Sequence, residues 1–265
     1  MTGNAAKQAE DVVNHMSSAA TGQNAWIRRF HPAPEARTRL ICLPHAGGSA
    51  NYYFPISAEL FPSVDVLAVQ YPGRGDRIRE SSVDNMETLA DCIVDALEPW
   101  RDLPLALFGH SMGATLAFEV ARRLEGDAVP LLALFASGRR APSRHRTGTV
   151  HLYSDDELMA ELKKLNGTDS QLLEDSSVLR LFLPAIRSDY KAIETYVHQS
   201  GSVIKCPIYA FFGDRDTGAT LEEVRAWRTH TVSHFELTEF PGGHFYLNEQ
   251  APAVIEIVSK YLAKL

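Results

Sequence analysis

Short apolar runs alternate with longer amphipathic stretches along most of the chain. Each run has the length and the β-branched or aromatic content of a strand that is buried on both faces. Between the runs, residues 86–97 and 112–124 carry apolar side chains at helical spacing. This alternation predicts an α/β fold with a mostly parallel, doubly wound sheet. The expected strands are 39–44, 64–70, 103–109, 129–137, 206–213 and 235–240.

The alternation is interrupted between about 142 and 205, where two helical patterns replace the strand-like runs. The first begins at Ser154, with Glu157 three residues later in the spacing of a capping box. The second covers 177–196 and contains Pro184, which we expect to interrupt and kink the helix. An insertion of this kind between two sheet strands is typical of a helical lid over a pocket. An additional packing layer is the alternative interpretation.

The composition narrows the class of protein. The chain has 265 residues, and its 26 Lys and Arg against 33 Asp and Glu give a net charge of −7. The length favours one α/β domain with an insertion, at 25–265, behind a polar tail at 1–24 that we expect to be mobile. The acidic balance argues against binding of nucleic acid, which usually requires a basic patch. No feature indicates an oligomer interface, so a monomer is expected.

Compartment and membrane association can be judged from the same composition. Cys42, Cys92 and Cys206 lie far apart in apolar contexts, which predicts buried free thiols in a reducing compartment. The apolar runs are far shorter than the roughly 18 residues that a membrane-spanning helix needs. The N-terminal residues have no apolar core of a secretory signal. A cytoplasmic location without membrane contact is therefore expected.

Gly109-His110-Ser111-Met112-Gly113 is the strongest local motif. It follows an expected strand and begins an expected helix, the context in which a serine hydroxyl is exposed on a tight strand-to-helix turn. Glycines flank the serine because side chains there would collide with the neighbouring strand and helix. The motif predicts that Ser111 is a nucleophile.

A serine nucleophile needs a base and a group that orients this base. His244 follows the last expected strand and therefore lies at the same sheet edge as Ser111, whereas His230 and His234 precede that strand and are expected at the surface. The acid is Asp214 or Asp216, after the strand 206–213. We favour Asp216, because it reaches further over the edge and Asp214 is better placed to brace the turn. The order Ser111, Asp216, His244 is that of an α/β-hydrolase.

The glycine-rich segment 44–49 ends the first strong strand. It lacks the lysine and spacing of a phosphate-binding loop. In an α/β-hydrolase this loop donates one backbone N–H to an oxyanion hole, here that of Ala46, and the residue after the nucleophile, Met112, donates the other. A plain tight turn is the alternative. His45 and His110 are interpreted as structural or pocket-lining residues.

Taken together, these motifs resemble a known family. PHAGGS (44–49), QYPGR (70–74), GHSMG (109–113), SGRRAP (137–142), GDRD (213–216) and PGGHFYL (241–247) are similar to the type II (external, editing) thioesterases of polyketide and nonribosomal peptide synthesis. The resemblance covers the chain from about Trp26 to the C-terminus. It implies hydrolysis of acyl groups from the phosphopantetheine arm of acyl or peptidyl carrier proteins, which removes aberrant units. It also implies the site residues Ser111, Asp216, His244, Ala46 and Met112.

The residues alone allow more than one interpretation of the function and of a basic run. The same residues would serve a carboxylesterase, a lipase or an acyltransferase, and a non-catalytic carrier-binding scaffold belongs to another class of function. The basic run Arg139, Arg140, Arg144 and Arg146 is either a docking site for an acidic carrier or a solvated loop. No residues have metal-ligand spacing, and no cofactor is expected beyond the phosphopantetheine that a partner protein carries.

Overall fold

The computed structural model describes residues 25–164 and 176–263, so the tail expected at 1–24 lies outside the described residues. A seven-stranded sheet has the order β1-β3-β2-β4-β5-β6-β7. All neighbouring strands are parallel except β1, which pairs antiparallel with β3 and was not expected from the sequence. The strands are β1 (Ile27–Arg28), β2 (Arg39–Leu43), β3 (Asp65–Val69), β4 (Leu105–His110), β5 (Leu131–Ser137), β6 (Ile208–Gly213) and β7 (Phe235–Phe240). The six strands expected from the sequence are therefore present and parallel.

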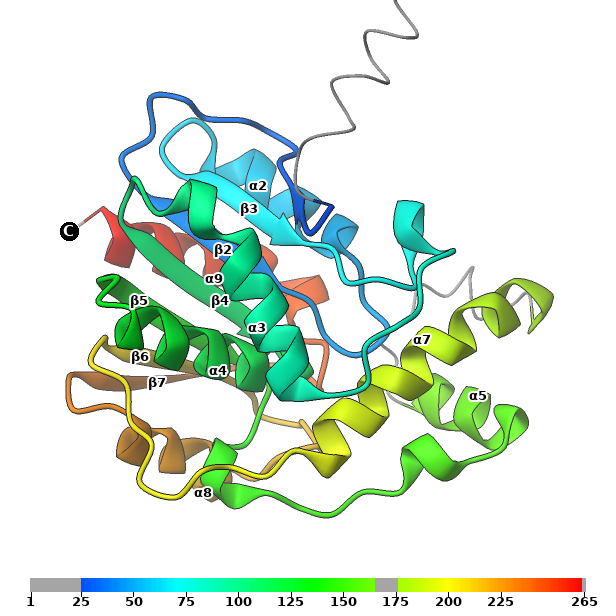
Figure 1. Ribbon diagram of the computed structural model, residues 1–265. Helices are drawn as coiled ribbons and strands as arrows, with labels where there is room; N and C mark the ends of the chain where they lie inside the picture. The colour runs from blue at the N-terminus through cyan, green and yellow to red at the C-terminus, as the bar shows by residue number, and fades with distance from the viewer. Residues whose placement is uncertain (1–24, 165–175, 264–265) are drawn as a thin grey trace, which may run out of the picture.

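Helices cover both faces of the sheet (Figure 1). On one face, α3, α4 and α8 pack against alternate strand residues such as Ile41 and Leu107. On the other face, α2 and α9 pack against the intervening residues, including Cys42 and Phe108. The helix bounds are α2 (Phe54–Leu60), α3 (Met86–Ala96), α4 (Met112–Gly126), α5 (Asp155–Lys164), α7 (Ser176–Thr195), α8 (Leu221–Arg225) and α9 (Leu247–Leu262).

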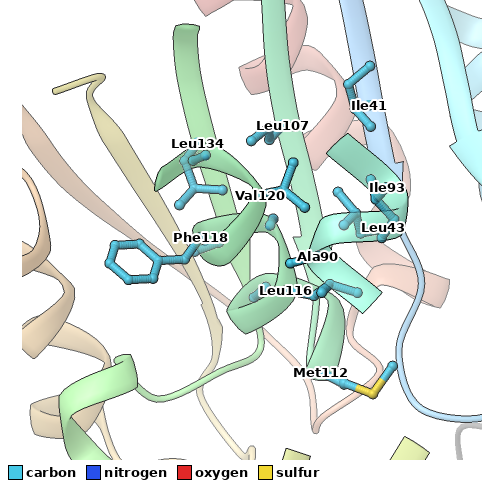
Figure 2. Close-up of a cluster of buried hydrophobic side chains, with 14 of the residues drawn as sticks. Ile41, Leu43, Ala90, Ile93, Leu107, Met112, Leu116, Phe118, Val120 and Leu134 are labelled. Atoms are coloured by element: carbon cyan, nitrogen blue, oxygen red, sulfur yellow. The ribbon is translucent and has the colours of Figure 1, made fainter. Parts of the chain in front are cut away.

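The most buried part of the core lies between α4 and the centre of the sheet. Figure 2 shows Leu107 of β4 and Leu134 of β5 gathered with Val120 of α4. Nearly every residue of α4 up to Ala121 is buried, which is typical of a helix that is covered on all sides by its own domain. This packing fixes α4 rigidly on β4, and the turn between them is correspondingly constrained.

The described part of the insertion contains α5 and α7, which lie together beyond one end of the sheet (Figure 1). The capping box is present, since Ser154 N–H donates to Glu157 (2.8 Å) and Glu157 N–H donates to the Ser154 hydroxyl (3.3 Å). Apolar side chains from both helices form a small core of their own, comprising Leu158, Met159, Leu162, Leu179, Leu183 and Ile186.

Pro184 lies inside α7, and the helix continues through it to Thr195. The expectation that proline interrupts this helix was therefore wrong. Pro184 is exposed, so the carbonyl group one turn earlier, which lacks its usual N–H donor, lies on the solvent side. The buried neighbours Leu183, Ala185 and Ile186 hold the helix in place.

Two further expectations concern cysteine and membrane contact. Cys42 and Cys206 are buried free thiols, and burial raises the pKa of both, whereas Cys92 is only half-buried. Within residues 25–164 and 176–263, none of the helices combines the length and apolar character required to cross a bilayer.

His230 is buried, with 2% of its surface exposed, although we expected it at the surface. The short 3-10 helix 226–230 turns the ring inward, where it contacts Phe118 and Trp227. Its Nε2 lies 2.8 Å from the Ser143 hydroxyl. The position of His230 before β7 therefore predicted the correct edge of the sheet, but it did not predict that the side chain is buried. His234 is exposed, as expected.

We predict that His230 makes the folded state sensitive to acid. Burial and the nearby ring of His198 lower the pKa of His230 from 6.5 to about 4. The unfolded chain takes up this proton near pH 6.5, so the stabilising contribution is complete above that pH and is lost as pH falls towards 4. His230→Gln should reduce the loss of unfolding free energy between pH 7.5 and pH 5 by about 1–2 kcal/mol.

Urea denaturation at the two pH values measures this difference. His234→Gln, at an exposed position, serves as the control and should leave the pH dependence of the wild type unchanged. An equal pH dependence in all three proteins would contradict the assignment of acid sensitivity to His230.

Candidate active site

Ser111 forms the turn between β4 and α4 in a left-handed backbone conformation, with φ 55° and ψ −119°. Both flanking glycines are required by close packing. A Cβ on Gly109 would lie 2.1 Å from the Gly113 carbonyl oxygen, and a Cβ on Gly113 would lie 2.1 Å from the Leu43 carbonyl oxygen. The missing side chains let α4 start directly against the ends of β2 and β4. The hydroxyl of Ser111 is thereby raised above the sheet edge.

The structure brings Ser111, His244 and Asp216 together from three strand ends. His244 Nε2 lies 2.9 Å from Ser111 Oγ, and His244 Nδ1 lies 2.9 Å from Asp216 Oδ2. The Asp216 carboxylate is completely buried, and its second oxygen accepts the Gly218 N–H at 2.7 Å. A carboxylate held in this way fixes the orientation of the imidazole and favours the tautomer whose Nε2 faces the serine.

Asp214, the alternative acid, has a different environment. Its carboxylate is exposed and accepts the Gly242 N–H at 2.9 Å, and no hydrogen bond joins it to His244. Arg215 N–H donates to the Gly242 carbonyl from the same loop. Asp214 therefore ties the loop after β6 to the loop that carries His244. This bracing contact is the one expected from its position at the strand end.

The two residues expected to donate backbone N–H groups to an oxyanion, Ala46 and Met112, lie at the same cavity as Ser111. Met112 is the first residue of α4, and Ala46 lies in the loop after β2. Both residues line one cavity with Ser111 and His244. Within the described part of the chain, no hydrogen bond occupies either N–H. Two free donors next to a serine oxygen are the arrangement that stabilises a tetrahedral oxyanion.

The cavity above Ser111 has a volume of about 540 Å³. Its floor and mouth come from the loops after the strands, and its roof comes from α5 and α7. The roof is apolar, so the cavity can hold an acyl chain with the carbonyl carbon at Ser111. The insertion contributes Leu162, Leu179, Phe182, Ile186, Tyr190 and Ile193 to the lining.

A model of a known protein family matches most of the chain. The family model described as "Thioesterase domain" matches residues 38–262, which is most of the chain. The chain belongs to the thioesterase family. The match spans the residues from β2 to the end of α9 and includes the whole described site.

Individual relatives of this thioesterase carry more specific names. Thioesterase PikA5 of Streptomyces venezuelae is 52% identical over 239 residues, which cover 89% of this chain and 85% of PikA5. The gramicidin S biosynthesis protein GrsT of Aneurinibacillus migulanus is 34% identical over 241 residues, covering 90% of this chain and 94% of GrsT.

Solved structures extend the comparison to the fold. The type II thioesterase BorB from the borrelidin biosynthetic cluster superposes with a TM-score of 0.86 and is 52% identical, covering 91% of this chain and 98% of BorB. RedJ, from the prodiginine pathway of Streptomyces coelicolor, superposes with a TM-score of 0.81 and is 37% identical, covering 87% and 88%. The resemblance to type II thioesterases and the α/β-hydrolase fold are thereby confirmed.

Two further histidines lie near His244 in the thioesterase, and burial disfavours the charged form of both. Burial lowers the pKa of His45 to about 3 and that of His110 well below its usual range. The rings of His110 and His244 are 5.3 Å apart, and His110 Nδ1 lies 2.9 Å from the Ser137 hydroxyl. Of the three rings, His244 is the one with a carboxylate partner. His45 and His110 are lining and structural residues, as expected from the sequence.

The basic run of the thioesterase does not form one exposed patch. Arg139 lines the cavity, and no hydrogen bond from its guanidinium is found among the described residues. Arg140 donates to the Gly218 carbonyl, next to Asp216, and Arg146 forms an ion pair with Glu223. Arg144 is exposed. The four arginines therefore occupy different environments, and only part of the run is available for docking.

An ion pair that was not expected from the sequence lies beside the site. Arg74 of the QYPGR motif also lines the cavity, and both of its terminal nitrogens bind the carboxylate of Asp189 in α7. A signal was present, because Asp189 falls at helical spacing among the lining residues Ile186 and Ile193 of α7. A charged residue on an otherwise apolar helix face requires a buried partner.

The two acids should respond differently to removal of charge. We expect Asp216→Asn to lower kcat by about 10⁴-fold, because the amide favours the wrong tautomer of His244. Asp214→Asn keeps an oxygen acceptor for the Gly242 N–H and should retain most of the activity. Steady-state hydrolysis of a short acyl thioester measures both variants, and circular dichroism verifies that they are folded. The reverse ranking in folded proteins would assign the acid to Asp214.

Proposed function

We propose that this thioesterase hydrolyses acyl thioesters on the phosphopantetheine arm of acyl or peptidyl carrier proteins through an acyl-enzyme on Ser111. The observation that carries the proposal is the 2.9 Å approach of Ser111 Oγ to His244 Nε2 in a largely apolar cavity that Ala46 and Met112 also line. Hydrolysis through a serine ester requires a nucleophile, a base, an oxyanion site and space for the acyl group. All four are supported by this arrangement.

The first half of the reaction forms the acyl-enzyme. Ser111 Oγ attacks the thioester carbon while His244 Nε2 accepts the hydroxyl proton. The carbonyl oxygen becomes an oxyanion, which the N–H groups of Ala46 and Met112 stabilise. The C–S bond then breaks, and His244 returns the proton to the departing thiolate. Asp216 holds the ring and stabilises the imidazolium between these steps.

The second half returns Ser111 to its free form. Water attacks the serine ester as His244 accepts a proton from it, and the same two N–H groups stabilise the second oxyanion. Collapse of this intermediate releases the carboxylic acid, and the proton passes from His244 to Ser111 Oγ. Apart from the water and the thiolate leaving group, the proton donors and acceptors in this scheme are side chains of the protein. Absence of a metal or cofactor remains an expectation from the sequence.

The names of the relatives support a role in assembly-line biosynthesis. BorB is described as a type II thioesterase of a biosynthetic cluster, and GrsT belongs to gramicidin S biosynthesis. We propose that this chain removes aberrant acyl units from stalled carrier proteins of a polyketide or nonribosomal peptide synthase. Membership of the thioesterase family does not favour the lipase, carboxylesterase and acyltransferase alternatives. A lid function for the insertion, a monomeric state and a cytoplasmic location stay predictions.

The nucleophile has a direct test. Ser111→Ala should lower kcat for any acyl thioester by about 10⁶-fold, because loss of the nucleophile disables the three residues as a unit. The variant should fold normally, since the small alanine side chain needs no new space at the turn. Wild-type enzyme stopped in acid during turnover should carry the acyl mass on the peptide that contains Ser111. Turnover within tenfold of wild type in the variant would remove Ser111 from this role.

Carrier recognition is tested by comparing two substrates with one acyl group. We expect kcat/KM to be higher for the carrier-bound thioester than for the same acyl group on N-acetylcysteamine, because the carrier adds contacts outside the cavity. Arg144→Gln should reduce this advantage at low salt without changing hydrolysis of the short substrate. Exposed charges act over about 10 Å at 0.1 M salt, so the effect should fade as salt is added.

Arg146→Gln is the matched control for Arg144→Gln, because the wild-type Arg146 charge is already paired with Glu223. Equal kcat/KM values for the two wild-type substrates would contradict carrier recognition. An advantage that survives Arg144→Gln at every salt concentration would place docking elsewhere on the surface.

A further inference from the structure

The loop that carries Ala46 is held by hydrogen bonds to several of its backbone groups. Tyr71 donates its hydroxyl to the Pro44 carbonyl (3.1 Å), and the Gly48 N–H closes a turn onto the His45 carbonyl (2.9 Å). The Ala50 N–H, at the end of the loop, donates to the side chain of Gln70 (2.8 Å). Buried backbone groups need such partners, so each contact restricts where the loop can lie.

Asp189 binds the backbone N–H of the residue that follows Ala46. Its Oδ2 accepts the Gly47 N–H at 2.7 Å and also the Arg74 Nη1 at 2.5 Å, while Oδ1 accepts the Arg74 Nη2 at 2.8 Å. Arg74 in turn donates to the Gly48 carbonyl at 3.2 Å. One carboxylate and one guanidinium therefore bind backbone groups of two consecutive residues, Gly47 and Gly48, which follow the proposed oxyanion donor.

The ion pair is inaccessible to water, with 3% of the Arg74 side chain and 1% of the Asp189 side chain exposed. A buried pair of this kind gains little stability over apolar side chains of the same size, because both charges must be dehydrated. The contribution of the pair is geometric. A bidentate ion pair tolerates one arrangement, and it imposes this arrangement on the backbone groups bound to it. Here those groups belong to the loop after β2.

The same face of α7 touches the loop a second time. A Cβ on Gly47, which has φ 76°, would lie 3.0 Å from Cγ1 of Ile186, one turn before Asp189. Ile186 also lines the cavity roof. The side chains that close the acyl cavity and the side chain that holds Gly47 are thus on one rigid helix. A shift of α7 would move both together.

We infer that Asp189, acting with Arg74, is a positioning residue that aims the Ala46 N–H at the oxyanion, so that the oxyanion hole is complete when α7 is seated over the cavity. This inference rests on the proposed function, since it requires Ala46 to be an oxyanion donor. It assigns to the helical insertion a part in the chemical step, in addition to its contribution to the acyl cavity.

Asp189→Asn tests the inference with little change of shape. The amide keeps one acceptor oxygen but loses the charge and one of the bonds shared by Arg74 and Gly47. For the acyl-N-acetylcysteamine substrate, kcat should fall by roughly 10²-fold, the lower end of the cost of losing an oxyanion donor. KM should change little, because the acyl cavity and its lining side chains are intact.

A pair of inhibitors separates positioning from general damage. An acyl trifluoromethyl ketone forms a tetrahedral adduct with Ser111 and places an oxyanion in the hole, whereas the corresponding thioether, without a carbonyl group, binds only through its chain. Asp189→Asn should weaken the ketone by about the factor lost in kcat. Binding of the thioether should stay within about threefold of wild type.

Asp65→Asn is the matched control for loss of a buried carboxylate. Asp65 is as buried as Asp189. It is the first residue of β3, where it pairs with Arg29 and Arg39. Asp65→Asn should lower the free energy of unfolding about as much as Asp189→Asn does, but it should leave kcat and the ketone affinity unchanged. The double variant Arg74→Met with Asp189→Leu replaces the ion pair by apolar side chains and should recover stability but not kcat.

The inference is overturned if folded Asp189→Asn keeps wild-type kcat, if ketone and thioether weaken equally, or if the apolar double variant regains full kcat. Failure of the proposed function has a different signature. It would appear as a lack of preference of the wild-type protein for the carrier-bound substrate, or as activity that survives in Ser111→Ala. The ketone measurement needs no carrier protein and is independent of the first of these results.

Discussion

The left-handed backbone at Ser111 is the constraint around which the site is arranged. A non-glycine residue in this conformation costs about 1–3 kcal/mol, which the surroundings must supply. β4 lies at the centre of the sheet, and α4 is buried against it along most of its length. Gly109 and Gly113 permit the approach that closes the turn. The core therefore holds the serine hydroxyl, and the Met112 N–H beside it, in place before any substrate arrives.

Electrostatics then selects one histidine from three. His45, His110 and His244 lie close together. The ring centre of His110 lies 6.0 Å from that of His45 and 5.3 Å from that of His244. Burial disfavours a charge on His45 and His110, and neither has a carboxylate partner. His244 has the buried carboxylate of Asp216 at 2.9 Å. His244, the proposed base, thus differs from the other two histidines in having a carboxylate partner as well as in its contact with Ser111.

The helical insertion is joined to the rest of the molecule at two places along and just after α7. Asp189 and Ile186 of α7 contact the loop that carries Ala46. Just beyond the end of α7, the Tyr196 hydroxyl donates to the Glu119 carboxylate of α4 at 2.7 Å. The helix that roofs the acyl cavity is therefore anchored to the helix that begins at Met112. The cavity roof and the loop after β2 are thus held by the same helix.

The sequence by itself determined the features that depend on local backbone sterics and on strand order. GHSMG specifies the turn at Ser111, and the positions of Asp216 and His244 after the last two strands bring both to the same edge, since parallel strands end on one side. Tertiary structure alone decided the burial of His230 and the separate environments of the four arginines. It also decided the pairing of Asp189 with Arg74, which are 115 residues apart. Such contacts depend on how an inserted helix lies over the sheet, and that placement follows from packing of whole surfaces rather than from any short motif.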